Sequence, residues 1–238
     1  MFHRGRLLPV FSAFLLLAAC TPPSTVTPPP GMPGSVRVAT PASGERLLQI
    51  DPQATLLTIT VRRGGALARL GHDHVIASRT VTGWVAPEPG QADFQFRLDA
   101  MTVDESGLRA QAGLDTTPSG DAIAGTRHNM LVRVLDAERY PLVRVQARLQ
   151  PGAQAADAAI TLHGVTRTVR VPVRLEQAGD GKSLRASGAL VLKQSDFGIV
   201  PFAILGGAMA VQDPMELAFD IVASNKVSAP GSAAVPAQ

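Results

Sequence analysis

Apolar and polar residues alternate along most of the chain between residues 47 and 223. The clearest case is residues 160–176, where two alternating runs are joined by residues 163–165. In the second run one face carries Val169, Val171, Val173 and Leu175, and the other carries Arg170, Pro172 and Arg174. Successive side chains of a strand point to opposite faces of a sheet, so this pattern predicts a half-buried strand. Gly164 between the runs predicts a tight turn or a bulge.

The same alternation predicts eight or nine short strands, over residues 47–51, 55–63, 75–85, 93–99, 142–149, 158–163, 166–176, 184–192 and 215–223. Turn residues lie between them, so the expected architecture is all-β, an antiparallel barrel or sandwich. Closure into a barrel removes exposed strand edges. A barrel of about eight strands has an interior that side chains fill or that holds one small ligand.

One segment, residues 121–135, has the spacing of a helix rather than of a strand. Met130 and Val134 recur four residues apart, and Asp121 is placed to cap the N-terminus. The preceding residues 101–120 are polar, contain Gly and Pro and show no steady period, which predicts a loop. We therefore expect one short helix within the β-structure.

The chain begins with the features of an export signal. Arg4 and Arg6 precede an apolar run over residues 7–19, which is shorter than the roughly 20 residues that span a bilayer. The run ends in LAAC, and this sequence, with its cysteine at position 20, resembles the lipobox of bacterial lipoproteins. The resemblance implies a lipoprotein signal peptide over residues 1–19 and lipidation of Cys20. A plain secretory signal with an incidental cysteine is the alternative.

Two further segments lack the alternation and are rich in small residues and proline. Residues 20–44 predict an extended tether that begins at the lipidated cysteine, and residues 224–238 predict a disordered tail. Residues 45–223 then form a single folded domain. Several acyl chains anchor a protein stably to a membrane, and Thr21 after the cysteine points, by resemblance to the sorting rule, to the outer membrane. The expected location is the bacterial cell envelope, facing the periplasm.

Composition narrows the classes of function. Hydrophobic residues make up 45% of the chain and charged residues 17%, which is enough for a sizeable core. Aromatic residues are only 4%, which argues against stacking platforms for single-stranded nucleic acid. Without Arg4 and Arg6, 20 basic residues face 19 acidic ones, so the charge does not indicate a nucleic-acid partner. The single cysteine excludes an intramolecular disulfide and a multi-cysteine metal site.

Three segments carry distinctive motifs, namely RHNMLVRVLDAERYPLVRVQA at residues 127–147, LHGVTRTVRVPV at residues 162–173 and KQSDFGI at residues 193–199. Together, and in this order, they resemble the YceI-like family of exported proteins. The resemblance implies an eight-stranded antiparallel lipocalin-like barrel with a helix over one opening. It also implies a long apolar cavity, which holds a polyisoprenoid chain in some members of the family. This chain departs from the family's pattern in carrying Gly-His-Asp-His at residues 71–74.

The predicted inward faces consist mostly of Val, Leu, Ala and Gly, and such small linings leave room for a ligand. We expect a polyisoprenoid or another lipid to contact apolar residues of the strands, the helix and the 193–209 segment, namely Phe94, Phe96, Met130, Val134, Val143, Val145, Val171, Val173, Phe197, Phe202 and Phe219. Plain packing of the same residues in a filled core is equally compatible with the sequence. Binding of this kind requires no cofactor.

His72 and His74 are one residue apart, so on a strand they face the same way and can converge on one metal ion. A third ligand would be needed, and Asp73, His128 and His163 are the candidates. The alternative is a polar turn in which Asp73 accepts backbone hydrogen bonds and the histidines are solvated. Without a recognisable third ligand we expect this turn rather than a metal site.

Other polar residues have structural explanations. We expect His163 to bond to the backbone in its turn, and Asp196 to cap a strand-to-loop corner where Phe197 plugs the core. Asp104 and Glu105 lie in the predicted loop, where a solvated pair is expected rather than acid–base chemistry. No catalytic constellation is recognisable, so we expect a binding protein and not an enzyme.

The main hypothesis is therefore a lipid-anchored envelope protein that holds an apolar ligand inside its barrel. One alternative is a metal-binding or redox protein that uses His72 and His74. Another is a structural envelope protein with a filled barrel. The membrane, through Cys20, and the lipid ligand are the expected partners, and the sequence points to no particular protein partner.

Overall fold

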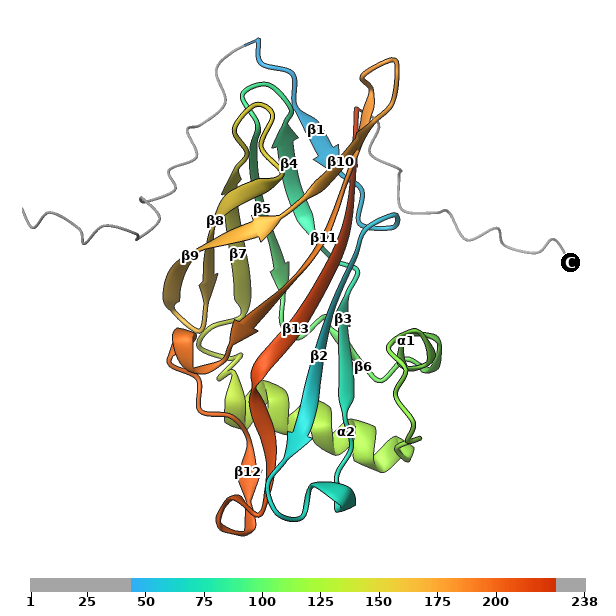
Figure 1. The fold of residues 1–238 in the computed structure, drawn as a ribbon, viewed down its shortest axis with the longest axis vertical. Helices are drawn as coiled ribbons and strands as arrows, with labels where there is room; N and C mark the ends of the chain where they lie inside the picture. Colours follow the sequence, from blue (N-terminus) through green and yellow to red (C-terminus); the bar gives the residue numbers. More distant parts are fainter. Residues whose placement is uncertain (1–43, 226–238) are drawn as a thin grey trace, which may run out of the picture. The chain divides into compact units, whose positions relative to one another are not determined.

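A computed structural model describes residues 44–225, which form an antiparallel β-structure with short helices (Figure 1). The strands, in chain order, are β1 (Leu48–Ile50), β2 (Leu56–Gly64), β3 (His74–Ser78), β4 (Thr82–Ala86), β5 (Gln91–Arg97), β6 (Thr102–Val103), β7 (Leu142–Arg148), β8 (Ala155–Leu162), β9 (Val165–Pro172), β10 (Arg174–Gln177), β11 (Ser183–Lys193), β12 (Ala203–Ile204) and β13 (Met209–Ser224). The predominantly β, antiparallel architecture is confirmed. The expected number of eight strands is wrong, because the described sheet has 13.

The sheet curves but does not close, which corrects the expected barrel. Hydrogen-bonded neighbours follow the order β6-β3-β2-β13-β1-β4-β5-β7-β8-β9, and β11 pairs with β13 and with β10. Among the described strands β9 pairs only with β8. Pro172, at the end of β9, has no N–H to donate, and the ladder with β11 starts only at Arg174, opposite Ser187. The proline therefore leaves a seam between β9 and β11.

The hairpin between β8 and β9 confirms the tight turn predicted at Gly164. Its two turn residues, His163 and Gly164, have φ values of +51° and +74°. Two consecutive positive φ values are typical of a type I′ turn, whose twist suits a two-residue hairpin. Glycine is also required by space, because a Cβ at position 164 would lie 2.7 Å from Cε1 of Tyr140.

The predicted helix is present as α2 (Gly120–His128), which is continued by a π-helical turn, η2 (Asn129–Val134). Its N-cap is Ser119, whose Oγ accepts a hydrogen bond from the N–H of Ala122 at 3.2 Å. The prediction that Asp121 caps the helix is therefore wrong, since Asp121 lies within the first turn.

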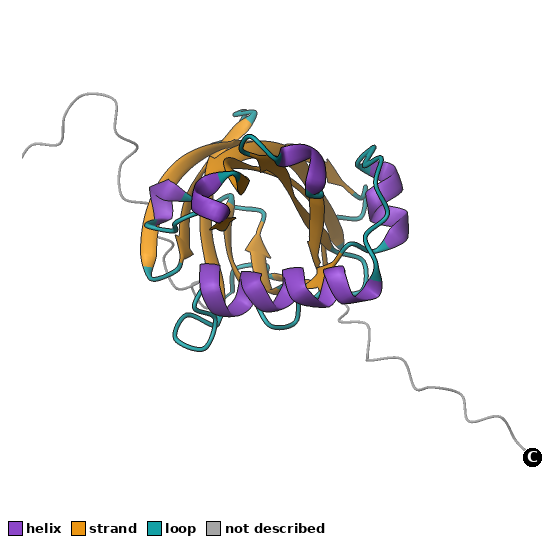
Figure 2. Ribbon diagram, turned by 90° about the horizontal axis from the view of Figure 1, so that it is seen from below, coloured by secondary structure: helices purple, strands orange, loops and turns teal. Residues whose placement is uncertain are grey.

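Apolar side chains of this helix pack against the main core cluster, among them Ile123, Met130, Leu131 and Val134. The helix lies at one end of the curved sheet, and Figure 2 views the domain from that end. The remaining helical turns are η1 (Ala68–Leu70), η3 (Ser195–Phe197) and η4 (Leu205–Gly207). Within residues 44–225 no helix is long and apolar enough to cross a membrane.

A second helix, α1 (Ser106–Gln111), lies in the segment predicted as a loop. It has six residues, too few to show a helical period. Long-range packing stabilises it, because Leu108 joins Val75 and Ala77 of β3 in a small apolar cluster. The predicted signal peptide, Cys20, and most of the predicted tether and tail lie outside the described residues.

Candidate functional site

A cavity of about 1120 Å³ lies inside the curved sheet. Its rim includes the β4–β5 turn at residues 86–91 and the β7–β8 turn at residues 149–154. Both turns lie at the end of the domain opposite α2 (Figure 1). No residue of α2 or η2 lines the cavity, so the hollow part of the domain stops short of the helix.

The wall of the cavity is apolar and contains many small side chains. Eight alanines line it, among them Ala147 on β7, Ala156 and Ala158 on β8, and Ala186 on β11. Large side chains at these inward positions would fill the interior to the density usual in protein cores. The small residues therefore keep the space open, and the interior of this domain is hollow rather than filled.

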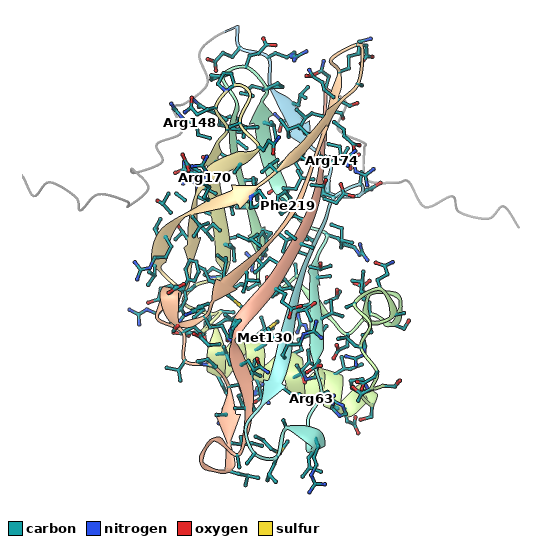
Figure 3. The ribbon with its side chains drawn as sticks, in the orientation of Figure 1. Arg63, Met130, Arg148, Arg170, Arg174 and Phe219 are labelled. Carbon is teal, nitrogen blue, oxygen red and sulfur yellow. The ribbon has the colours of Figure 1, made fainter. Side chains whose placement is uncertain are left out.

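Phe219 on β13 forms part of the wall and lies opposite Gly188 on β11. A Cβ at position 188 would lie 2.7 Å from Cζ of the Phe219 ring and 2.2 Å from the carbonyl oxygen of Pro172. Glycine thus lets the aromatic ring lie over the neighbouring strand, and it also lets β9 approach β11 at the seam. Figure 3 shows Phe219 near the middle of the domain and Met130 below it, at the α2 end.

Seven of the eleven predicted ligand contacts line the cavity, namely Phe94, Phe96, Val143, Val145, Val171, Val173 and Phe219. The other four lie elsewhere. Met130 and Val134 belong to η2 and pack on the core, and Phe197 is 0% exposed within it. Phe202 lines a separate, smaller pocket. Met130, Val134 and Phe197 lie where packed side chains take the space that a lipid would need.

The predicted set omitted large apolar lining residues of the strands, such as Leu57 and Leu217, and two further groups of lining residues. One group comprises the small residues of β8 and β11, such as Ala156, Ala158 and Ala186. Their position on the inward face of alternating strands was a usable signal, because small inward residues leave volume. The other group is the two rim turns, which carry no apolar period and could be placed only by the fold.

The three family-like segments contact one another at a structural junction, and two of them also supply cavity-lining residues, such as Val145 and Val171. The ring of Tyr140 packs edge-on against that of His163, with centroids 4.8 Å apart. Arg167 donates from Nε to the carbonyl oxygen of Asp196 at 2.6 Å. The aromatic contact to Tyr140 is the role that the structure gives His163, in place of the expected backbone bond. These segments therefore hold the turns together.

The corner at η3 is capped by a residue that the sequence did not indicate. Asp213 accepts hydrogen bonds from the backbone N–H of Ser195 at 2.8 Å and from its hydroxyl at 2.6 Å. These bonds lower the pKa of Asp213. The prediction that Asp196 is the cap is wrong, whereas Phe197 is buried in the core as expected.

Asp104 is not part of a solvated pair, which corrects that expectation. Its side chain is 0% exposed, and Oδ2 lies 2.6 Å from Nδ1 of His74. Oδ1 accepts from the N–H of Val75 at 3.1 Å and from Nη1 of Arg109 at 2.6 Å. Asp104 also has φ +57°, an unusual value that this set of bonds holds in place.

The ionisation of Asp104 follows from these contacts. Burial acts to raise the pKa of this carboxyl, but hydrogen bonds from His74, Val75 and Arg109 outweigh it, so the pKa lies below its ordinary value. An ionised carboxylate only accepts, so Nδ1 of His74 carries the proton that is shared with Oδ2. This leaves Nε2 as the nitrogen of His74 that can bind a ligand.

The structure brings His72 and His74 together but not the third ligands proposed for them. Both histidines line a pocket of about 110 Å³, with ring centroids 6.2 Å apart. Asp73 instead accepts from the N–H of Arg63 at 2.8 Å, and His163 contacts Tyr140. Among the described residues no group of three His, Cys, Asp or Glu side chains is placed to hold a metal ion.

The described domain matches one family model and is similar in fold to solved structures. A family model of the YceI-like domain matches residues 48–223. A polyisoprenoid binding domain from Saccharophagus degradans, implicated in plant cell wall breakdown, has a similar structure, with a TM-score of 0.53 and 12% sequence identity. The match covers 74% of this chain and 97% of that chain. BcnA from Burkholderia cenocepacia is similar at 16% identity and a TM-score of 0.50, with 74% and 99% covered. No curated protein matched the sequence. At sequence identities of 12% and 16%, the similarity to these two structures shows a shared fold and nothing more specific.

Proposed function

The chain belongs to the YceI-like family, and from this premise we propose that its domain binds the apolar chain of a lipid inside the curved sheet. The observation that carries the proposal is the cavity of about 1120 Å³ with its wall of Phe, Val, Leu and Ala. Pockets for small ligands usually measure about 300–1,000 Å³, so this space suits a long ligand. Burial contributes about 0.8 kcal/mol per CH₂ group, so a long chain binds without any catalytic group.

We propose a polyisoprenoid, or a lipid of similar length, as the ligand. The structural neighbour from Saccharophagus degradans is described as a polyisoprenoid binding domain, which supports this choice. The distribution of polar groups supports an amphiphile, because Glu88, Gln150 and Arg174 line the cavity near its rim while the interior is apolar. The chain of the ligand lies between Phe94 and Phe219, and its polar end lies near the rim.

An anchor at Cys20 completes the proposal and places the domain on the periplasmic side of the outer membrane. The predicted lipobox supports this anchor. Metabolic labelling with radioactive palmitate tests it, since the wild-type chain becomes labelled and the Cys20→Ser chain does not. Equal labelling of both chains, or of neither, contradicts lipidation at this residue.

The ligand itself is tested by purifying the full-length protein from cell envelopes, extracting it with organic solvent and identifying the released lipids by mass spectrometry. A polyisoprenoid or other long-chain lipid in stoichiometric amount is the expected result. The delipidated protein is then titrated with geranylgeraniol. Absence of extracted lipid together with absence of geranylgeraniol binding contradicts the proposal.

A further inference from the structure

A second pocket, of about 110 Å³, lies outside the apolar cavity, where the β2–β3 connection meets β12 and β13. Three side chains capable of binding a metal line it, namely His72, His74 and Met209. The other described lining residues are apolar or glycine, except Arg63, and none of them carries a carboxylate. The volume suits a single ion and is well below the roughly 300 Å³ of the smallest usual ligand pockets.

His74 is oriented as metal-binding histidines are. Its Nδ1 donates to the buried carboxylate of Asp104 at 2.6 Å, and Arg109 holds that carboxylate from the other side. A carboxylate on one ring nitrogen fixes the tautomer and raises the basicity of the other nitrogen toward a metal. Asp104 therefore prepares Nε2 of His74 as a ligand.

His72 contributes a nitrogen that lacks a partner. Its Nδ1 is buried, and among the described residues it has no hydrogen-bond partner. Buried polar atoms in native proteins nearly always have a partner, so this nitrogen indicates a missing one. Two imidazoles that bind one ion through N–metal bonds of about 2.0 Å have ring centroids up to about 6.4 Å apart. The observed separation of 6.2 Å between His72 and His74 falls within that limit.

We propose that His72, His74 and Met209 bind a monovalent copper ion. Thioether sulfur and imidazole nitrogen together favour Cu(I), whereas Ca²⁺ and Mg²⁺ require the oxygen ligands that this wall lacks. Arg63 donates to the carbonyl oxygen of Gly71 at 3.1 Å and lies within 4 Å of two carboxylates, so part of its charge is balanced. A monovalent ion is repelled less by the remaining charge than a divalent one.

The site is distinct from the lipid cavity. Arg63, on its wall, lies at the α2 end, whereas Phe219 lies farther from that end, near the middle of the domain (Figure 3). None of the three proposed ligands lines the larger cavity. Geranylgeraniol binding is therefore expected to be equal in the Met209→Leu variant and the wild type, so the copper proposal and the lipid proposal can fail separately.

The test is anaerobic titration of the full-length protein with Cu(I) against a competing chromogenic chelator. We expect one ion per wild-type chain, and at least a tenfold loss of affinity in Met209→Leu and in His72→Asn. Met215→Leu, on the same strand but outside the pocket, is the matched control and keeps wild-type affinity. Asp104→Asn lowers the affinity by about 10- to 100-fold, as losses of such supporting carboxylates usually do.

X-ray absorption spectroscopy supplies the second readout and does not depend on affinity. The wild-type spectrum is expected to require one sulfur scatterer, and the Met209→Leu spectrum none. Circular dichroism confirms that each variant is folded. Absence of copper binding by the wild type, equal affinities of Met209→Leu and Met215→Leu, or bound copper without a sulfur ligand overturns the proposal.

Discussion

Ala186→Phe is the substitution that tests the hollow interior most simply. Ala186 lies on β11 and lines the cavity, so a phenyl ring there enters empty space and displaces no packed side chain. Ala189 lies on the same strand, is exposed and does not line the cavity, so Ala189→Phe is the matched control. Both variants gain the same apolar group, but only one of them loses volume for a ligand.

The expected loss of affinity follows from the chain length that the ring displaces. If the ring takes the place of about three methylene groups of a bound lipid, the loss is about 2.4 kcal/mol at about 0.8 kcal/mol per group. Since about 1.4 kcal/mol corresponds to a tenfold change, Kd rises about 50-fold. Ala189→Phe is expected to leave Kd within about twofold of the wild type, because exposed substitutions act weakly.

The assay is displacement of a fluorescent polyene fatty acid from delipidated protein by geranylgeraniol, with thermal unfolding of each variant recorded in parallel. Unchanged melting temperatures show that any loss of affinity comes from the cavity. Equal Kd values for Ala186→Phe and the wild type, in folded protein, would refute the reasoning that the lipid lies between the strands.

Three further predictions concern the polar network and the turns. Arg109→Met leaves the buried carboxylate of Asp104 without one partner, so the free energy of unfolding falls by about 3–5 kcal/mol in urea denaturation, and an unchanged midpoint contradicts this. Folding lowers the pKa of Asp104, so the stabilisation that its ionised carboxylate provides is present above the ordinary carboxyl range and is lost as the pH falls through the folded-state pKa. Between pH 7 and pH 3, the free energy of unfolding of Asp104→Asn is therefore expected to fall less than that of the wild type. Equal losses would refute the lowered pKa of Asp104. Gly164→Ala is expected to cost about 1–3 kcal/mol, because position 164 has φ +74° and a Cβ there meets Tyr140; calorimetry that finds no change would contradict this account of the turn.

The alternation of apolar and polar residues was sufficient to place most strands and their faces. Residues 93–99 illustrate this, since Phe94 and Phe96 point inward on β5 as their period indicates. The number of strands was not predictable, because β6 and β12 have two residues each and no pattern of that length is readable. The open seam depends on Pro172 and on its distance from β11, and only the fold supplies that distance.

The burial of Asp104 and the pocket shared by His72 and Met209 were not predicted, because both depend on contacts between residues that only the fold brings together. Asp104 lies in a polar segment of the sequence, yet it is buried because Arg109 and His74 reach it from α1 and β3. Met209 is 137 residues from His72 along the chain and lines the same pocket only because of the fold. No local pattern indicates such a pairing.

Photo-crosslinking tests the central claim, lipid binding inside the sheet, most directly. Full-length protein is saturated with a diazirine-bearing geranylgeraniol analogue, irradiated, digested and mapped by mass spectrometry. The account predicts labels on cavity residues such as Phe94, Val145 and Phe219, and their loss when unlabelled geranylgeraniol is added. Labels confined to exposed apolar residues at other places, such as Val200 at 81% and Leu205 at 68% exposure, would contradict it.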